Sequence, residues 1–424
     1  MIGEVIAIGD ELISGRVLNT TSRFIASKLF ASGRTLKKIT VIGDNIKDIK
    51  DALLSAINTS EFVIVSGGLG PTTDDITNEA VSKSLGIPLV KNTQIEEQIK
   101  EVEQNFGKDA REQFKKKLVM LPKGAKVLNP EGHAAGYELD YNGVYLFFLP
   151  GVPEQLKDHL IKRVIPRLNQ LDKRRPFVFQ EIFKIFGLSE IEINISIEKL
   201  IPKDSSIKIG YYPVFPEVHV SITVIDSVKD KAKEKFGEVL KKISNEFKEN
   251  IVAIGEEGSL AKTVGELLKK KGFMLACAES CTGGLLGATV TDIPGSSGWF
   301  DSSIVTYSNR EKEKILYVSQ ATLAKYGAVS RNTALEMLKG VRKITGCECI
   351  LAITGIAGPD GGTDEKPVGT VYIGMSVNDK DFVHRFLFSG SRSEIRQLSV
   401  ETSLDWLRRY LCYDSLLPGY KPVE

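Results

Sequence analysis

The sequence is poor in histidine and cysteine and has no excess of charge of either sign. Its 424 residues include four histidines and five cysteines, and the formal net charge is +2. This near-neutral balance excludes the basic stripe of nucleic-acid-binding proteins and a polybasic membrane anchor. The cysteines are odd in number and all lie beyond residue 276, which favours reduced thiols over a disulfide framework. They are Cys277, Cys281, Cys347, Cys349 and Cys412.

Long apolar runs are absent as well. No stretch approaches the ~20 apolar residues that a membrane-spanning helix needs. The start, Met1-Ile2-Gly3-Glu4, has no basic region and no cleavage signal, so we expect no secretory peptide. These features predict a cytoplasmic protein with no membrane partner. The apolar content of 42% is typical of globular proteins, and the length suggests two or three domains.

Strand-like and helix-like segments alternate over residues 1–170, which predicts an α/β domain with a parallel sheet. The expected strands cover 3–9, 36–43, 61–66 and 144–149. The expected helices cover 17–32, 45–58, a segment ending at Leu85 before Gly86, and a segment running toward Leu168.

A polar linker at 169–176 separates this domain from a small α+β domain over 176–254, expected to read strand, helix, strand, helix. That segment has no G-x-x-G loop of the kind used to bind single-stranded RNA. A second α/β domain is expected over 258–414, with a possible antiparallel edge. Its expected strands cover 273–278, 302–307, 349–354, 368–377 and 382–388, and its expected helices cover 260–271, a segment from about 282, 310–316, 331–345 and 392–411.

Ser280 is the candidate nucleophile. It lies in AESCTGG (278–284), where a strand is expected to end and a helix to begin. At such a position a hydroxyl is exposed at the sheet edge, and unpaired N–H groups near Thr282, Gly283 and Gly284 can stabilise an oxyanion. The alternative interpretation, a Ser/Thr cap before a tightly packed glycine helix, is equally compatible with this segment alone.

A serine nucleophile needs a base, and the histidines are His133, His159, His219 and His384. Only His384 lies in the last domain, so a Ser-His-Asp triad or a Cys281-His pair is disfavoured. A lysine with a lowered pKa is the remaining common solution. Lys312, expected at a helix start after a strand, is the first candidate, and Lys366 is the second. For either residue the alternative is a solvated surface charge.

Two further segments of the last domain suit an anionic ligand. The glycine-rich loop 354–363, which includes Gly355 and Gly358, is able to hold a phosphate or ribose, although a structural turn explains it equally well. Arg392 and Arg396 are four residues apart at the start of the last helix, a favourable place for a phosphate. Surface arginines paired with acids are the alternative.

In the first domain, GGLGPTTDD (67–75) places three glycines before two acids at a helix start. Glycine-rich turns at helix N-termini bind phosphate, and carboxylates beside a phosphate indicate a shared divalent cation. The expected phosphate-binding residues are Gly67, Gly68, Gly70 and Thr72, and the expected metal ligands are Asp10, Glu11, Asp74 and Asp75. Helix capping by Asp74 and ordinary turn chemistry are the alternatives.

The C-terminal motifs together resemble a known family. AESCTGG (278–284), PGSS (294–297), VTYSN (305–309), GAVS (327–330), TGIAGPDGG (354–362) and KPVGTVY (366–372) resemble the C-terminal domain of the competence/damage-inducible CinA family, which is similar to nicotinamide mononucleotide deamidase. The resemblance implies hydrolysis of nicotinamide mononucleotide to nicotinate mononucleotide and ammonia, with no cofactor. It also implies a dyad of Ser280 and Lys312, with Tyr307 and Thr354 near the substrate and Arg392 and Arg396 toward its phosphate.

GDELISG (9–15), GGLGPTTDD (67–75) and LPGVPE (149–154) resemble the molybdopterin-binding-like domain of the same family. Here the resemblance implies an ADP-ribose pyrophosphatase that needs a divalent metal (Mg, Mn or Co), although Thr21 and Gln155 depart from the family pattern. The middle segment resembles the family's KH-type domain, and a homodimer is a family expectation. Two other hypotheses remain: a nucleotide-binding adaptor without N-terminal turnover, and a molybdopterin-pathway enzyme.

Overall fold

The computed structural model describes residues 1–97, 117–129, 136–415, 417 and 419–423, so His133 lies outside the described residues. The chain forms two compact units. The first comprises residues 1–179 with 225–233, and the second comprises residues 180–224 with 234–424. Three larger sheets give the chain its α/β architecture, as expected.

The first sheet has the strand order β2-β1-β3-β8-β7-β6. Its strands are β1 (Ile2–Ile8), β2 (Thr35–Ile42), β3 (Phe62–Ser66), β6 (Lys126–Val127), β7 (Tyr137–Tyr141) and β8 (Val144–Leu149). The neighbours β2, β1, β3 and β8 are parallel, which confirms the expected parallel sheet, whereas β7 and β6 add an antiparallel edge. A separate antiparallel pair joins β4 (Leu89–Lys91) and β5 (Met120–Pro122).

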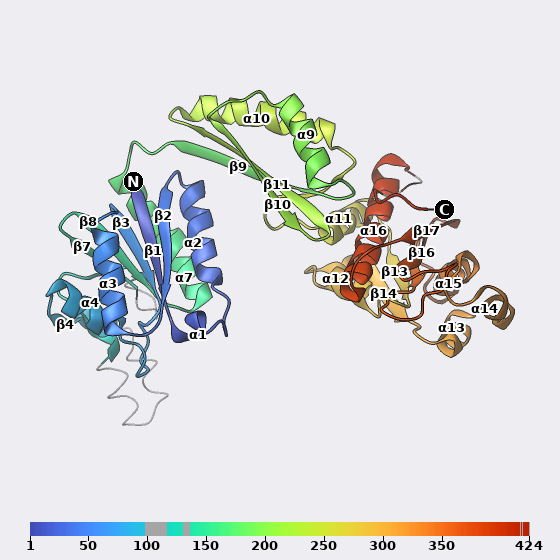
Figure 1. Cartoon of the computed structure of the whole chain (residues 1–424), viewed down its shortest axis with the longest axis horizontal. Helices are drawn as coiled ribbons and strands as arrows, with labels where there is room; N and C mark the ends of the chain where they lie inside the picture. Colours follow the sequence, from blue (N-terminus) through green and yellow to red (C-terminus); the bar gives the residue numbers. More distant parts are fainter. Residues whose placement is uncertain (98–116, 130–135, 416, 418, 424) are drawn as a thin grey trace. The chain divides into compact units, whose positions relative to one another are not determined.

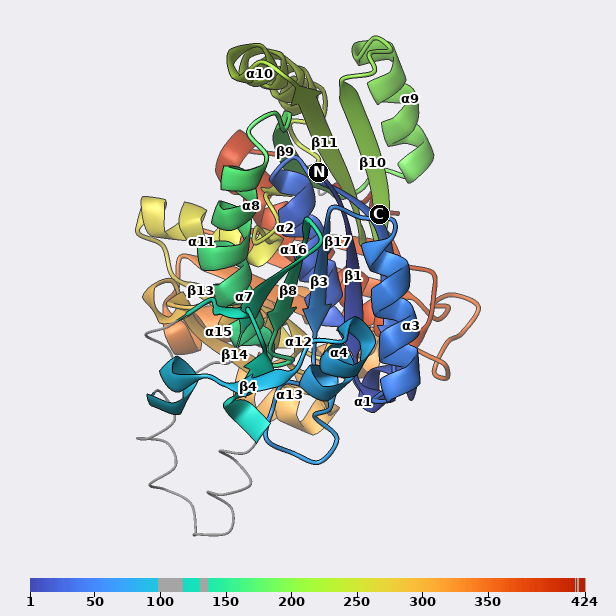
Figure 2. The same ribbon diagram turned by 90° about the vertical axis from the view of Figure 1, so that its left-hand side faces the viewer.

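Helices cover both faces of this sheet (Figures 1 and 2). They are α1 (Asp10–Ile13), α2 (Thr20–Ala31), α3 (Ile46–Ile57), α4 (Thr77–Leu85), α7 (Pro153–His159) and α8 (Ile165–Leu171), with a π-helical segment (Leu160–Val164) between the last two. One hydrophobic cluster joins the sheet to α3 and α4, and another joins it to α2, α7 and α8. The helix expected over 17–32 begins at Thr20, because the Asn19 side chain accepts a hydrogen bond from the Ser22 N–H at 3.1 Å and caps it. The helix α8 extends over residues 169–171 of the expected linker.

The middle domain has more strands than expected. Its elements are β9 (Phe177–Ile185), α9 (Glu190–Leu200), β10 (Ile207–Val214), β11 (Glu217–Asp226), α10 (Lys229–Glu246) and β12 (Ile251–Ile254), in a sheet ordered β10-β11-β9-β12. The prediction of strand, helix, strand, helix was wrong because 207–226 is a hairpin of two strands. Its turn, Phe215-Pro216, lacks the Asn-Gly or Asp-Gly pair that signals a tight hairpin. The short strand β12 was missed as well.

The third sheet has the order β14-β13-β15-β16-β17. Its strands are β13 (Leu275–Glu279), β14 (Phe300–Val305), β15 (Cys349–Gly355), β16 (Thr370–Val377) and β17 (Lys380–Leu387). The strands β14, β13 and β15 are parallel, whereas β16 and β17 are antiparallel to their neighbours, which confirms the expected antiparallel edge.

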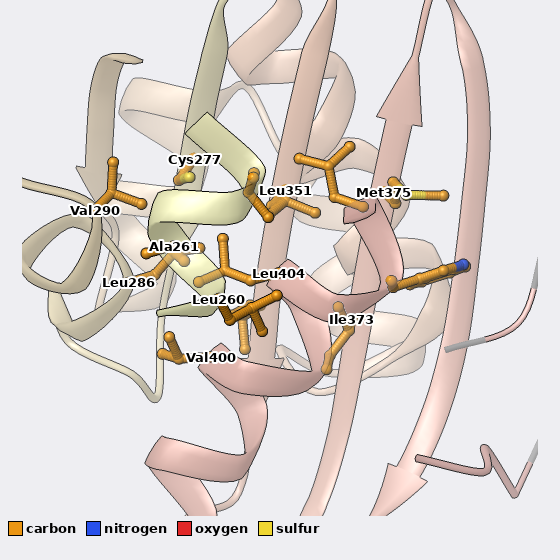
Figure 3. Packing of buried hydrophobic residues seen from close by; sticks show 14 of the residues in the cluster. Leu260, Ala261, Cys277, Leu286, Val290, Leu351, Ile373, Met375, Val400 and Leu404 are labelled. Atoms are coloured by element: carbon orange, nitrogen blue, oxygen red, sulfur yellow. The ribbon is translucent and has the colours of Figure 1, made fainter. Parts of the chain in front are cut away.

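Helices also cover both faces of the third sheet. They are α11 (Leu260–Lys271), α12 (Leu285–Thr291), α13 (Asn309–Leu316), α14 (Gln320–Tyr326), α15 (Arg331–Thr345) and α16 (Arg392–Tyr413), with a 3-10 turn at Ser296–Gly298. Leu260 of α11, Leu286 of α12 and Leu404 of α16 pack on Cys277 and Leu351 of the sheet (Figure 3). The opposite cluster joins the sheet to α13, α14 and α15. Among the described helices, none combines the length and apolar character needed to cross a membrane.

Two expectations for this domain were wrong. The helix expected from about residue 282 begins at Leu285, because Gly283 and Gly284 have φ of 59° and 93°, outside the right-handed helical region. The chain therefore forms a turn between β13 and α12. The helix α14 was not predicted at all, since its seven residues are too few for a clear helical period.

Gly265 in α11 allows a close approach of this helix to Trp299, so replacement by alanine should destabilise the C-terminal domain. A Cβ at this position would lie 2.5 Å from Trp299 Cε2. We expect Gly265→Ala to lower the free energy of unfolding by about 1–3 kcal/mol. Both tryptophans, Trp299 and Trp406, lie in this domain, so urea unfolding followed by tryptophan fluorescence measures the change.

The matched control is Gly237→Ala in α10, where an added Cβ meets no atom within 4 Å. This change should leave the tryptophan transition unaltered. An unchanged transition in Gly265→Ala would contradict the close packing of α11 against Trp299.

Candidate active site

The carboxyl ends of β13, β14 and β15 form one edge of the third sheet. The register pairs Glu279 of β13 with Val305 of β14 and with Ile353 of β15. The residues that follow, Ser280 and Thr306, therefore meet beside Thr354. Open α/β sheets bind ligands at this edge, so the sequence-predicted residues of three separate segments are brought to a favourable place.

Ser280 and Lys312 are in direct contact. Lys312 Nζ lies 2.9 Å from Ser280 Oγ and also donates to the Thr306 backbone oxygen at 2.6 Å. Lys312 is only 1% exposed, and Ser280 is 7% exposed. The serine hydroxyl thus has a buried amine in hydrogen-bond range, which is the geometry that a nucleophile and its base require.

Burial lowers the pKa of Lys312 to about 8, and the neighbouring Cys281 thiol opposes this shift weakly. An amine with such a pKa is partly neutral near physiological pH and is then able to accept a proton. Burial also raises the pKa of Cys281 to about 12, so the thiol next to Ser280 stays protonated. A thiolate is the nucleophilic form of cysteine, and the pairing of Cys281 with a base is therefore not supported.

The other two candidate bases lie elsewhere. Lys366 Nζ donates to the Tyr326 backbone oxygen at 2.8 Å. His384 lies on β17, which β15 and β16 separate from β13, a distance of about 14 Å at ordinary strand spacing. Its ring packs on Trp406 with the centroids 4.8 Å apart. The structure thus selects Lys312 among the alternatives.

The turn after Ser280 uses several of its N–H groups internally. The Gly283 N–H donates to the Ser280 oxygen at 3.1 Å, and the Gly284 N–H donates to Glu279 Oε2 at 3.0 Å. These two groups are therefore engaged, contrary to the expectation that they are available to an oxyanion. Within the described part of the chain, the Thr282 N–H makes no hydrogen bond, the Cys281 N–H interacts with its own thiol, and the buried Thr282 hydroxyl has no partner.

Arg392 and Arg396 both contact the loops of the site. Arg392 Nη1 donates to the Gly358 oxygen at 2.6 Å, and its Nη2 donates to the Tyr307 hydroxyl at 3.1 Å. Arg396 donates through Nε and Nη2 to the Thr282 oxygen, at 3.1 and 2.6 Å. The two arginines thus connect the start of α16 to all three loops, and Tyr307 remains 64% exposed at the mouth of the site.

The loop after β15 is shaped by close packing. The Thr354 hydroxyl donates to the Ala328 oxygen at 2.8 Å and is fully buried. A Cβ on Gly355 would lie 2.7 Å from Val371 Cγ2, and one on Gly358 would lie 2.6 Å from Val368 Cγ1. Both glycines are therefore needed for packing, which is the structural-turn alternative left open by the sequence.

The first sheet gathers acids at its own carboxyl edge. The Asp10 N–H donates to Asp44 Oδ2 at 2.9 Å, and the Asp44 N–H donates to Asp10 Oδ1 at 3.1 Å. Burial raises the pKa of Asp44, and the negative charges of Asp10, Glu11 and Asp74 raise it further. The four carboxyl groups are thus close enough to repel one another.

This cluster fits a divalent cation only in part. Among the described residues, no three His, Cys, Asp or Glu side chains are grouped tightly enough to form a complete metal site. Magnesium sites commonly use one or two carboxylates together with waters and substrate phosphates. The acids therefore suit a cation that arrives with a phosphorylated substrate, and relief of the repulsion around Asp44 would favour its binding.

The glycine-rich loop after β3 is held by its own side chains. Asp75 Oδ2 accepts hydrogen bonds from the Thr72 N–H and hydroxyl, at 2.8 and 2.6 Å. Gly67 and Gly68 have φ of 103° and 64°, and a Cβ on Gly70 would lie 2.5 Å from Asp75 Oδ2. Asp75 and Thr72 thus stabilise the loop, and Lys117 Nζ donates to the Thr72 oxygen.

Sequence reasoning missed three residues of these sites. Asp44 follows β2 as Asp10 follows β1, so the rule that parallel strands end at one edge was sufficient to find it. Lys117 was missed because its segment was assigned to no predicted element. Glu279 lies within AESCTGG, but a buried carboxylate next to a nucleophile is not suggested by residue spacing.

Three family descriptions match successive parts of the chain. Residues 4–170 match "Probable molybdopterin binding domain", residues 180–253 match "Damage-inducible protein CinA KH domain", and residues 257–411 match "CinA C-terminal domain". The three matched ranges agree with the three sheets.

Relatives match over the full length. A "CinA-like protein" of Desulfotalea psychrophila is 44% identical over 97% of this chain and 99% of its own. A "CinA-like protein" of Geotalea uraniireducens is 37% identical over 96% of both chains. A solved structure titled as a CinA superfamily protein of Klebsiella pneumoniae is 32% identical and covers 36% of this chain and 96% of its own, with a TM-score of 0.35.

The contact of Lys312 with Ser280 predicts a serine that reacts with phenylmethanesulfonyl fluoride, and a rate that depends on pH. Because the pKa of Lys312 is about 8, the fraction of neutral amine rises as the pH increases through this value. We expect sulfonylation of Ser280 to rise with a midpoint near pH 8 and to fall at least about 100-fold in Lys312→Met. Mass spectrometry of the peptide that contains Ser280 measures the rate.

Lys366→Met is the matched control, because it removes a lysine that contacts Tyr326 instead of Ser280. Its rate and midpoint should equal those of the unaltered protein. Equal labelling of Lys312→Met and the unaltered protein would show that this amine does not activate the serine.

Proposed function

The chain belongs to the CinA family, and from this premise we propose that its C-terminal domain hydrolyses the carboxamide of nicotinamide mononucleotide to nicotinate mononucleotide and ammonia. The observation that carries the proposal is the 2.9 Å contact between a buried lysine amine and Ser280 Oγ. A Ser/Lys pair hydrolyses amides through a covalent ester and needs no metal or organic cofactor.

In the first half of the proposed reaction, neutral Lys312 accepts the Ser280 proton as the hydroxyl oxygen attacks the carboxamide carbon. A C–O bond forms, and the carbonyl oxygen takes the negative charge. When this tetrahedral intermediate collapses, the C–N bond breaks and Lys312 gives its proton to the departing nitrogen. Ammonia leaves, and nicotinate mononucleotide remains attached to Ser280 as an ester.

In the second half, Lys312 accepts a proton from a water molecule that attacks the ester carbon. Collapse of the second tetrahedral intermediate breaks the bond to Ser280 Oγ, and the proton returns to this oxygen. Hydroxyl and amine are then restored, so the cycle consumes only water. The same amine thus acts as base and acid in turn, which requires a pKa near the working pH.

The developing oxyanion needs donors that are not already engaged. Since the Gly283 and Gly284 N–H groups have partners within the protein, we assign this role to the Thr282 N–H. Removal of one such donor typically costs about 100- to 1000-fold in turnover. Both arginines donate to backbone oxygens of the site, but Arg392 is exposed beside Tyr307, whereas Arg396 is half-buried. We therefore assign Arg392 to the substrate phosphate.

Replacement of either dyad residue should abolish turnover of nicotinamide mononucleotide. We expect Ser280→Ala and Lys312→Ala each to lower kcat at least about 1000-fold, because each change removes one half of a unit that acts together. Ammonia release by the purified full-length protein is the measurement.

Lys366→Ala and His384→Ala serve as controls, and both should keep nearly full turnover. Hydrolysis that persists in Ser280→Ala would remove this nucleophile from the mechanism. If the unaltered protein releases no ammonia, nicotinamide mononucleotide is not the substrate and the dyad acts on a different amide.

A second activity is supported by the acids at the edge of the first sheet. We propose that the N-terminal domain hydrolyses ADP-ribose with the help of a divalent cation held by Asp10, Asp44 and the substrate phosphates. The raised pKa of Asp44 and the repulsion from Glu11 and Asp74 favour a cation there. When bound, such an ion would polarise the pyrophosphate and neutralise its charge.

ADP-ribose hydrolysis should therefore need added Mg²⁺, Mn²⁺ or Co²⁺ and should fall at least about 100-fold in Asp10→Asn and in Asp44→Asn. The release of AMP, followed by chromatography, measures the rate. Asp140→Asn is the control, because Asp140 is an exposed residue of β7 whose side chain accepts from the Gly143 N–H at 3.1 Å. Binding of ADP-ribose without hydrolysis under all three metals would favour the nucleotide-binding adaptor.

A further inference from the structure

Glu279 is a fully buried acid that directly precedes the nucleophile. It is the last residue of β13, and its side chain is 0% exposed. Because side chains alternate along a strand, Glu279 lies on the same face as Leu275 and Cys277, which α11, α12 and α16 cover. The acid is thus enclosed between the sheet and the start of α12.

The Glu279 carboxylate has four hydrogen-bond donors. Oε2 accepts from the N–H groups of Gly284 and Leu286, both at 3.0 Å. Oε1 accepts from the Gly287 N–H at 2.8 Å and from Ser303 Oγ at 2.6 Å. A buried carboxylate is costly without such partners, and here the unpaired N–H groups of the first turn of α12 supply three of them.

These bonds fix both ends of the turn that carries Ser280. At its start, the Ser280 N–H donates to the Ile353 oxygen at 3.0 Å, which continues the sheet. At its end, Glu279 holds Gly284 and Leu286. The backbone between these points contains only Ser280, Cys281, Thr282 and Gly283, so its freedom to move the hydroxyl is small.

Close packing of α12 against β14 supports the same arrangement. A Cβ on Gly287 would lie 2.7 Å from Ser303 Cβ and 3.5 Å from Glu279 Oε1. Gly287 lets α12 approach β14 closely. Thr306 directly follows β14, and its carbonyl accepts from Lys312 Nζ. The Glu279 carboxylate therefore connects β13, which directly precedes Ser280, with α12 and with β14, which directly precedes Thr306.

We propose that Glu279 is a positioning residue for the nucleophile, one that holds Ser280 Oγ at hydrogen-bond distance from Lys312 by fixing the 280–284 turn to α12 and β14. This inference rests on the proposed Ser/Lys chemistry, but it applies to any acyl substrate. It also explains why the N–H groups of the first turn of α12 do not serve the oxyanion. They are engaged with Glu279.

The test compares full-length Glu279→Gln and Ser303→Ala with the unaltered protein. An amide in place of the carboxylate loses one acceptor and directs an NH₂ group at N–H or O–H donors. A misplacement of about 1 Å costs about 100-fold in rate. We therefore expect Glu279→Gln to lower kcat for nicotinamide mononucleotide about 10- to 100-fold with KM changed less than about threefold.

Labelling of Ser280 by phenylmethanesulfonyl fluoride provides a readout that does not depend on the proposed substrate. In Glu279→Gln the labelling rate should fall by the same factor, while its midpoint stays near pH 8 because the Lys312 pKa is set by burial and Cys281. In Ser303→Ala, which removes one of the four donors, the labelling rate should fall about threefold. Failure of the unaltered protein to hydrolyse nicotinamide mononucleotide, with labelling intact, would contradict the proposed function alone.

Glu348→Gln is the matched control. Glu348 Oε2 accepts from the Met274 N–H at 2.9 Å, at the opposite end of β13, so this change should leave labelling unaltered. Labelling of Glu279→Gln at the normal rate, or a shifted midpoint with a normal maximal rate, would overturn the proposal. If Glu279→Gln shows no cooperative tryptophan transition on unfolding, Ser303→Ala decides, and normal labelling of that variant overturns the proposal.

Discussion

The proposed chemistry depends on one contact, a lysine amine buried against a serine hydroxyl. Transfer of an ammonium group from water to a protein interior is unfavourable, and among the residues that the structure describes no carboxylate pairs with Lys312 Nζ to offset this cost. The amine therefore loses its proton more readily than a surface lysine. With the Thr306 oxygen on one side and Ser280 Oγ on the other, it is oriented toward the proton that it must accept. Scarcity of histidine is then no obstacle to hydrolysis.

In both α/β domains the parallel strands end at one edge of the sheet, but the side chains that meet there suit different chemistry. In the C-terminal domain, three parallel strands end beside one another and bring together Ser280, Thr306 and Thr354. In the N-terminal domain, Asp10 and Asp44 follow the ends of β1 and β2, and negative charge is concentrated there. One edge thus carries a buried amine and a hydroxyl, and the other carries acids suited to a cation.

The sequence predicted the alternation of strands and helices well, because buried parallel strands such as 61–66 and 144–149 have continuous apolar runs. It also predicted that Ser280 and Lys312 lie in contact, since two segments that each follow a strand meet at one edge. It did not predict that Gly283 and Gly284 delay the start of α12 or that their N–H groups are occupied. The Gly284 N–H is occupied by the side chain of Glu279, whose four partners are brought together only by tertiary packing. The sequence did not predict the β10–β11 hairpin, because its turn lacks the Asn-Gly or Asp-Gly pair that signals a tight hairpin.

Direct titration of the Lys312 amine tests the central claim. Protein labelled with ¹³C at lysine Cε gives one NMR resonance for each lysine, and the Lys312 resonance is identified by its loss in Lys312→Arg. The account predicts that this resonance titrates with a midpoint near pH 8, whereas surface lysines titrate near 10.4. A Lys312 resonance that titrates together with the surface lysines would contradict the account, because the amine would then be charged and unable to accept the serine proton.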